Sequence, residues 1–175
     1  MENDFLELIK TRRSCRHYKA EQVKDGELNA ILEAGTYAPT GHGLQDPIIV
    51  AVQQPQLMER LARLNAKIMG VESNPYYGAP TYLLVFASKD NANAFQDGSC
   101  VLENMMLAAH ALGLGTCWIN REYQMFATDE GRSIMDEMQL DKDALIGIGA
   151  LSLGYPAHEP RPAKPRKEGW TKIVR

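Results

Sequence analysis

The sequence predicts an α+β fold in which helices pack around a mixed β-sheet to form a sandwich. Short apolar runs rich in β-branched residues, such as residues 48–52, are typical of buried strands. Longer stretches with apolar residues at helical spacing, such as residues 56–69, are typical of amphipathic helices. The two kinds of segment do not alternate regularly, which argues against a repeated βαβ arrangement. A chain of 175 residues fits one domain with a sizeable core.

The predicted elements follow one another in a mixed order. A helix is predicted to start at Asp4, where a capping residue is followed by Glu7 three positions later. The stretch 97–112 offers few positions suited to solvent, so we expect a central, nearly all-buried helix that Gly113 can end in the left-handed conformation. The other helices are expected from residue 25 to between 35 and 37, at 56–69 and at 129–138, and the strands at 48–52, 82–87, 116–119 and 145–153.

Two loops and the C-terminal segment interrupt these elements. Residues 39–45 and 74–80 are rich in glycine, proline and polar residues, a composition typical of loops. Four prolines after residue 155 forbid a regular helix, and the chain then ends in an apolar segment that contains Trp170, Ile173 and Val174. Such a segment is either a disordered tail or an arm packed on another subunit. Its large apolar residues favour the arm.

The composition is that of an ordinary globular protein. With 45% hydrophobic residues, 23% charged residues and a net charge of −3, the chain is not expected to bind nucleic acid or an anionic membrane. The cysteines, Cys15, Cys100 and Cys117, are widely spaced and offer neither a disulfide framework nor a Cys-x-x-Cys metal pair. The N-terminus has no secretory signal and the chain has no long apolar run, so we expect a reduced, cytoplasmic protein.

Several common kinds of site have no match in the sequence. The glycine pairs at 41–43 and 147–149 begin a dinucleotide-binding pattern, but neither is followed by the third glycine. There is no P-loop, no Gly-x-Ser-x-Gly elbow and no metal-ligand spacing among the histidines, so no metal site is predicted. His110 and Cys117 are better interpreted as a satisfied core histidine and a small buried side chain. Such a chain is typical of a protein that delegates its chemistry to a cofactor.

Positive charge is concentrated in two clusters, each of which is either a solvated basic face or a local anion site. The turn from Arg12 to Arg16 carries permanently charged, bidentate donors and the hydroxyl of Ser14. These are the groups that a phosphate monoester and a polar ring edge require. The second cluster consists of Arg161, Lys164, Arg166 and Lys167.

Further motifs follow one another along the chain. Residues 12–16 match the pattern Arg-Arg-Ser-x-Arg, and residues 109–116 match Ala-x-x-Leu-Gly-Leu-Gly-Thr. Residues 38–45 follow Ala-Pro-Ser-x-x-Asn-x-Gln except at Thr40, a mild change from serine, and at Gly43. Asp97-Gly98 with Asn104 and Met105, and the ending Leu153-Gly154-Tyr155-Pro156, also fit. In this order, and over essentially the whole chain, these motifs resemble those of the nitroreductase family of FMN-dependent enzymes.

The resemblance implies a three-layer sandwich, with a mostly antiparallel sheet flanked by helices, and a homodimer with two FMN sites at the interface. Residues 1–155 would form the FMN-binding domain, and residues 156–175 a C-terminal extension of the same domain that packs on the partner subunit. NADH or NADPH would be the co-substrate, and flavin N5, rather than a protein side chain, would carry the chemistry. The implied FMN contacts are Arg12, Arg13, Ser14, Arg16, Pro39, Thr40, Gly41, Gly43, Gln45, Leu114, Gly115, Thr116 and Arg166.

The resemblance also implies a role for each group of contacts. Residues 12–16 of one subunit would contact the FMN phosphate, ribityl chain and pyrimidine edge, and residues 39–41 would approach the same flavin from the partner. Residues 114–115 would lie by the ring, where a backbone donor could stabilise the reduced flavin. Arg166, alone or with a lysine at 164 or 167, would complete the phosphate site.

Two departures from the family pattern bear on the substrate. Gly43 stands where the family usually has asparagine, and Asp46 follows Gln45 where proline is common. The missing amide removes a polar contact to the flavin or the substrate, which Gln45, His42 or a water molecule would have to replace.

The resulting hypothesis is a ping-pong reductase. NADH or NADPH delivers a hydride to the flavin and leaves, and a nitroaromatic, quinone or similar small acceptor then binds where the nucleotide was. Two alternatives stay open: a flavin-binding or flavin-processing module that NAD(P)H does not reduce, and an anion-binding interaction protein that uses the two basic clusters. Tyr76, Tyr77 and His42 are candidates for lining the pocket, with ordinary loop packing as the alternative.

Overall fold

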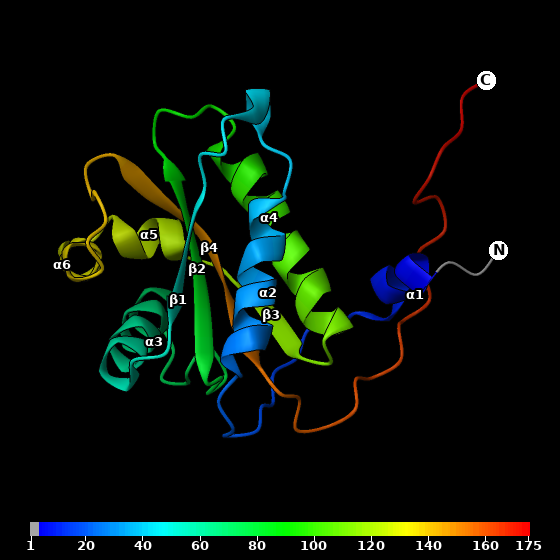
Figure 1. The fold of residues 1–175 in the computed structure, drawn as a ribbon, viewed down its shortest axis with the longest axis horizontal. Coiled ribbons are helices and arrows are strands. Elements are labelled where there is room, and N and C mark those ends of the chain that lie inside the picture. Colours follow the sequence, from blue (N-terminus) through cyan, green and yellow to red (C-terminus); the bar gives the residue numbers. More distant parts are fainter. Residues whose placement is uncertain (1–3) are drawn as a thin grey trace.

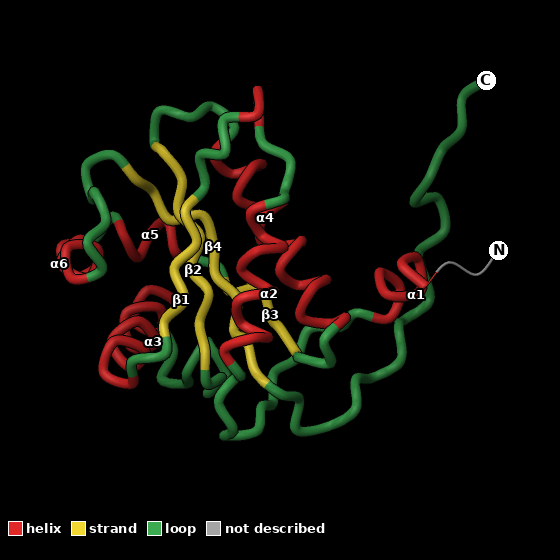
Figure 2. The backbone as a smooth tube through the Cα atoms, in the orientation of Figure 1, coloured by secondary structure: helices red, strands yellow, loops and turns green. Residues whose placement is uncertain are grey.

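A four-stranded sheet forms the centre of the computed structural model, which describes residues 4–175 (Figures 1 and 2). The strand order is β1-β2-β4-β3, and each neighbouring pair is antiparallel. A parallel bridge between Ser14 and Thr116 adds a short pairing at β3. The predicted α+β sandwich is therefore confirmed. The strands are β1 (Ile48–Val52), β2 (Thr81–Ser88), β3 (Gly115–Ile119) and β4 (Leu145–Gly154).

The central strand β2 contributes to two separate cores because successive side chains of a strand point to opposite faces of the sheet. Leu84 and Phe86 pack in one core, and Leu83 and Val85 pack in the other. All four side chains are fully buried. A strand covered on both faces reads as a continuous apolar run, which is the pattern that made this segment recognisable in the sequence.

Helices α2 (Asp25–Thr36) and α4 (Ala94–Ala111) cover one face of the sheet (Figure 1). The two helices approach closely at Gly35, where an added Cβ would lie 2.9 Å from Met105 Cγ. Asn104 Nδ2 donates to Ala34 O at 3.1 Å across the same contact. The prediction of a central, buried helix is confirmed, although α4 begins at Ala94, three residues before the expected start.

The other face is covered by α3 (Pro55–Met69), α5 (Glu122–Phe126) and α6 (Asp129–Glu137). The short helix α5 was not predicted from the sequence. Thr128 caps α6, because its hydroxyl accepts a hydrogen bond from Gly131 N at 3.0 Å. Gly131 is required by close packing, since an added Cβ would lie 1.9 Å from Met125 O.

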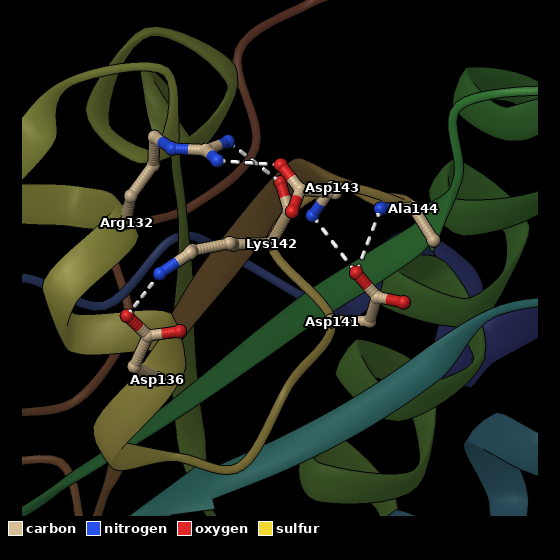
Figure 3. A network of polar contacts seen from close by, with 6 residues as sticks. All are labelled: Arg132, Asp136, Asp141, Lys142, Asp143 and Ala144. Atoms are coloured by element: carbon tan, nitrogen blue, oxygen red, sulfur yellow. Dashed lines mark hydrogen bonds and ion pairs between the residues drawn. The ribbon is translucent and has the colours of Figure 1, made fainter.

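A group of ion pairs holds the turn between α6 and β4 (Figure 3). Arg132 donates to Asp143 Oδ1 at 2.6 Å and to Lys142 O at 2.8 Å, and Lys142 pairs with Asp136. Asp141 Oδ1 accepts the backbone N–H groups of residues 143 and 144. These contacts close the turn and lie on the face of the sheet opposite α4, so we assign them to the fold.

Helix α1 (Asp4–Thr11) and the C-terminal segment lie to one side of the sheet, where α1 contacts the last turn of α4 (Figure 1). Helix α1 buries none of its side chains, and its apolar residues Phe5, Leu6 and Ile9 are 57%, 50% and 46% exposed. After Tyr155 and Pro156, which pair with the segment around Tyr18, the chain forms no helix or strand through residue 175. Residues 1–3 of the predicted domain lie outside the described residues.

No helix in the described part of the chain is both long and apolar enough to cross a bilayer.

Candidate functional site

The turn that follows α1 presents charged donors with no internal partner. Arg13 Nη1 donates to Lys10 O and to Arg12 O, each at 2.7 Å, which fixes the guanidinium against the end of the helix. Arg12 Nη1 and Arg13 Nε are buried, and within residues 4–175 they have no hydrogen-bond partner. A buried donor left unpaired costs about 1–3 kcal/mol, and more when it carries a charge. The turn is therefore suited to bind an anion, with the exposed Ser14 beside it.

The same turn is joined to the segment that links α4 to β3. Ser14 forms its parallel bridge with Thr116, and Cys15 N donates to Thr116 O at 2.8 Å. Gly115 permits this approach, because an added Cβ would lie 2.6 Å from Cys15 Cβ. Two motifs that are about 100 residues apart in the sequence are thus assembled at one place. Gly113, with φ 78°, ends the helix in the left-handed conformation, as predicted.

His110 connects the last turn of α4 to the arginine turn. Its Nε2 lies 2.9 Å from Thr11 Oγ1, the side chain directly before Arg12. Partial burial and the positive charges of Arg12 and Arg13 lower the pKa of His110, so the ring stays neutral near pH 7. His110 is thus satisfied, as predicted, but it is half-buried at the edge of the turn rather than enclosed in the core.

Cys117 is buried in β3, and burial raises the pKa of its thiol. A thiol held protonated is a poor nucleophile. The interpretation of Cys117 as a small buried side chain is therefore confirmed.

The loop of residues 39–45 is held by its own backbone and by α4. Gly41 N donates to Asp97 Oδ1 at 2.9 Å, and Asp97 is buried in the first turn of the helix. Gln45 N donates to Thr40 Oγ1 at 3.0 Å across the loop. A hollow of about 370 Å³ opens beside it, and Thr40 and Gln45 are among the side chains that line this hollow.

The structure shows the surroundings of both residues that depart from the family pattern, Gly43 and Asp46. Gly43 has φ 67°, and no heavy atom lies within 4 Å of an added Cβ. Asparagine also tolerates this left-handed region, so the usual family residue fits the same backbone. Asp46 Oδ2 accepts hydrogen bonds from Ser88 N and Asn91 Nδ2, both at 3.0 Å, and Asn91 also donates to Asp97 Oδ2 at 3.1 Å. Asp46 thus anchors the loop to the end of β2.

The loop and the turn lie at opposite ends of α4 (Figure 1). The loop contacts Asp97 in the first turn of the helix, and the arginine turn contacts His110 in the last. Asp97 and His110 are 13 residues apart, which is about 20 Å along the helix axis, in a helix about 27 Å long. One chain therefore does not bring residues 39–45 and residues 12–16 to the same small ligand.

The C-terminal basic cluster does not join the arginine turn within one chain. The hydrogen bonds of Arg166 both run to Lys164 O, at 2.6 Å and 3.2 Å. The segment around them extends away from the sheet on the side of α1 (Figure 1). Its apolar residues Trp170, Ile173 and Val174 are 73%, 76% and 84% exposed.

The two tyrosines of the loop at 74–80 have opposite environments. Tyr76 is fully buried, stacks on Tyr82 with ring centroids 4.0 Å apart, and donates to Glu122 Oε1 at 3.0 Å. For Tyr76, loop packing is therefore the correct interpretation. Tyr77 is 40% exposed and accepts a hydrogen bond from Arg16 Nε at 3.3 Å, which places it beside the arginine turn.

Glu122 is a buried carboxyl that was not predicted from the sequence. Burial raises its pKa from 4.5 to about 7, and only Oε1 has a partner within the described residues. In the structure, Met125 and Phe126, three and four residues later, lie on the same helical face and are buried, but the sequence alone did not predict this helix. A carboxyl on an apolar helical face is a candidate for burial.

Comparisons with known proteins show which family the chain belongs to. The nitroreductase family model matches residues 9–81 and 70–155. A nitroreductase from Bacteroides fragilis, solved with bound FMN, is 32% identical, with 99% of this chain and 100% of that chain covered and a TM-score of 0.91. A nitroreductase from Desulfitobacterium hafniense shares the fold, with a TM-score of 0.87 at 24% identity over 99% of this chain and 100% of that chain.

A relative from Methanothermobacter thermautotrophicus, whose name includes "NADH dehydrogenase/NAD(P)H nitroreductase", is 29% identical over 161 residues. The match covers 90% of this chain and 80% of that protein. Together with the assembled motifs, these matches show that the chain belongs to the nitroreductase family.

Proposed function

We propose that the chain is an FMN-dependent oxidoreductase that passes reducing equivalents from NADH or NADPH to a nitroaromatic, quinone or similar small acceptor. The observation that carries this proposal is the pair of buried guanidinium nitrogens on Arg12 and Arg13, which have no hydrogen-bond partner among the described residues 4–175. Such donors fit the phosphate of FMN. The solved Bacteroides fragilis relative contains FMN, and the name of the Methanothermobacter relative supports NAD(P)H as the donor.

Each segment has a role in holding the cofactor under this proposal. Residues 12–14 would bind the phosphate and ribityl chain, and Arg16 would face the pyrimidine edge. Leu114, Gly115 and Thr116 would border the ring, because the bridge at Ser14 joins them to the turn. The neutral His110 would keep the start of the turn in place without competing for the anion.

The site would be completed by a second copy of the chain. Residues 39–45 lie too far from the arginine turn to serve the same flavin within one chain, so Pro39, Thr40, Gly41, Gly43 and Gln45 would approach the flavin of the partner. Residues 1–155 would form the FMN-binding domain. Residues 156–175 would extend over the partner, where Arg166 would reach the phosphate and the exposed apolar tip would be buried.

Bound FMN supplies hydride transfer through its N5. The chain holds the cofactor by its phosphate and presents one open site, which the nicotinamide donor and the acceptor use in turn. No side chain is required as an acid or a base, since solvent can supply protons to the reduced product.

The test is the absorption spectrum of the purified chain, followed by NADH and NADPH oxidation with a quinone or a nitro compound. We expect flavin bands, or their appearance after FMN is added, and turnover with at least one nucleotide. A colourless protein that gains no flavin bands contradicts the cofactor. A yellow protein that neither nucleotide reduces supports the alternative, a flavin-binding or flavin-processing module.

A further inference from the structure

The loop between α3 and β2 contains a strained tyrosine. Tyr77 has φ 58° and is followed by Gly78 with φ 66°, so two successive residues adopt the left-handed conformation. Glycine adopts it freely, whereas a tyrosine in this region is strained. The surrounding structure must therefore hold Tyr77 in place, and such strain is often found where a side chain has a function.

Two sets of contacts hold the backbone around Tyr77. Asn74 accepts hydrogen bonds from Tyr76 N at its side chain, at 2.8 Å, and from Tyr77 N at its carbonyl, at 3.1 Å. The buried Tyr76 is fixed by its stack on Tyr82 and its hydrogen bond to Glu122. An anchored residue thus directly precedes an exposed one, and the strained φ directs Tyr77 away from the core.

Tyr77 meets Arg16 through two kinds of contact. Arg16 Nε donates to Tyr77 Oη at 3.3 Å, and the guanidinium carbon lies 5.6 Å from the centroid of the Tyr77 ring. A cation in this range is attracted by the face of an aromatic ring. The hydrogen bond uses Nε, and neither terminal nitrogen of Arg16 donates to another group in the part of the chain that the structure describes.

From this geometry we infer that Tyr77 is a positioning residue of the flavin site, which fixes the Arg16 guanidinium so that its free pair of nitrogens faces the pyrimidine edge of FMN. The inference rests on the proposed function and goes beyond it. A flexible, exposed arginine loses side-chain entropy when it binds, and an aromatic partner that fixes it beforehand reduces that loss. A fixed positive charge at this edge also favours the reduced cofactor, which is more negative there.

The test is a double-mutant cycle on FMN affinity and on the midpoint potential of the bound flavin. Tyr77→Phe keeps the ring and removes the hydroxyl, and Arg16→Ala removes the positioned group. We expect Tyr77→Phe to weaken FMN binding about five- to tenfold, a part of what a hydrogen bond to a charged group contributes, and to make the potential more negative. In the Arg16→Ala background the same change should have no further effect on either quantity.

Tyr123→Phe is the matched control, because Tyr123 is 50% exposed and pairs with Phe95 rather than with the turn. Thermal unfolding of each apoprotein shows whether the variants remain folded. If Tyr77→Phe binds FMN as the parent does, with the same potential, or if the two substitutions are additive, the positioning role is wrong while the proposed function stands. If the parent chain binds no FMN, the proposed function itself fails.

Discussion

The two ends of helix α4 carry different halves of the same proposed site. At its last turn, the arginine turn and residues 114–116 are bonded together and present unpartnered cationic nitrogens. At its first turn, the loop of residues 39–45 is closed on itself and on Asp97, and offers a hollow but no lysine or arginine. The end at the last turn of α4 has the charge to bind a phosphate, and the end at the first turn has the shape to cover a ring.

Under the proposed function, neither end of α4 is a complete site. A rigid helix about 27 Å long keeps the two ends apart within one chain, so they can meet on one ligand only if two chains pair. The exposed apolar residues of α1 and of the C-terminal segment are the surface that such pairing would cover.

The largest effect is expected from Arg12→Ala at the charged end. Removal of a guanidinium that has a buried, unpartnered nitrogen should weaken FMN binding more than about a hundredfold, because a bidentate contact to phosphate is lost. FMN fluorescence titration measures the change. Arg132→Ala is the control: it removes the ion pair with Asp143 and the hydrogen bond to Lys142 O shown in Figure 3, and should lower the thermal midpoint without changing the FMN affinity. Equal losses of FMN affinity in both variants would contradict a specific role of Arg12 in binding the phosphate.

Glu122 lies in α5, on the face of the sheet opposite α4, and should affect the stability of the fold rather than FMN binding. The folded chain keeps this proton up to about pH 7, whereas the unfolded carboxyl releases it near pH 4.5. The free energy of unfolding therefore falls as pH rises between these values, by up to roughly 3 kcal/mol, and changes no further above them.

Glu122→Gln should remove this fall while its amide oxygen still accepts from Tyr76. Urea unfolding of both proteins at pH 5 and pH 8 gives the difference, and FMN affinity at pH 8 should stay within about twofold. A parent protein whose stability relative to the variant does not change between these pH values would contradict a buried, proton-holding Glu122.

Gly115→Ala tests the junction at the charged end. The new Cβ would overlap Cys15, so the bridge between Ser14 and Thr116 should open, at a cost of about 1–3 kcal/mol in unfolding free energy and with weaker FMN binding. Gly26→Ala is the matched control, because nothing lies within 4 Å of a Cβ at that helical position. Differential scanning calorimetry compares the stabilities of the two variants. The junction is unimportant if Gly115→Ala behaves like the control.

The smallest effect is expected from Gly43→Asn at the loop end. The backbone is already in a conformation that asparagine tolerates and the position is open, so stability should change by less than about 1 kcal/mol. The restored amide should leave FMN affinity equal or tighten it. A large loss of stability would contradict this expectation and show that the conformation of the loop requires glycine at position 43.

Much of the fold followed from local patterns. The strands and the long helices were predicted to within a few residues, because buried apolar runs and helical periodicity are local properties. Helix α5, with five residues, is too short to show a period. That α1 buries none of its side chains was not predictable, since its apolar stripe suits packing within the chain as well as packing on another.

The candidate site was predictable only in part. The motifs at residues 12–16, 38–45 and 109–116 were recognised by resemblance, and the structure joins the first to the third. The contact of Arg16 with Tyr77 joins residues 61 positions apart and depends on a strained φ, so no local sequence pattern predicts it. The separation of the loop from the turn depends on the length and direction of α4, which are properties of the packed fold.

Subunit complementation tests the central claim, that one flavin site is built from two chains, most directly. Chains with Arg12→Ala and chains with an altered loop, Thr40→Ala with Gln45→Ala, are produced separately and together, and bound FMN per subunit is measured. Each variant alone should bind little FMN, whereas random pairing should restore about a quarter of the sites, because half the dimers contain one intact turn opposite one intact loop. If the mixture binds no more FMN than the separate variants, the site lies within one chain and the account is wrong.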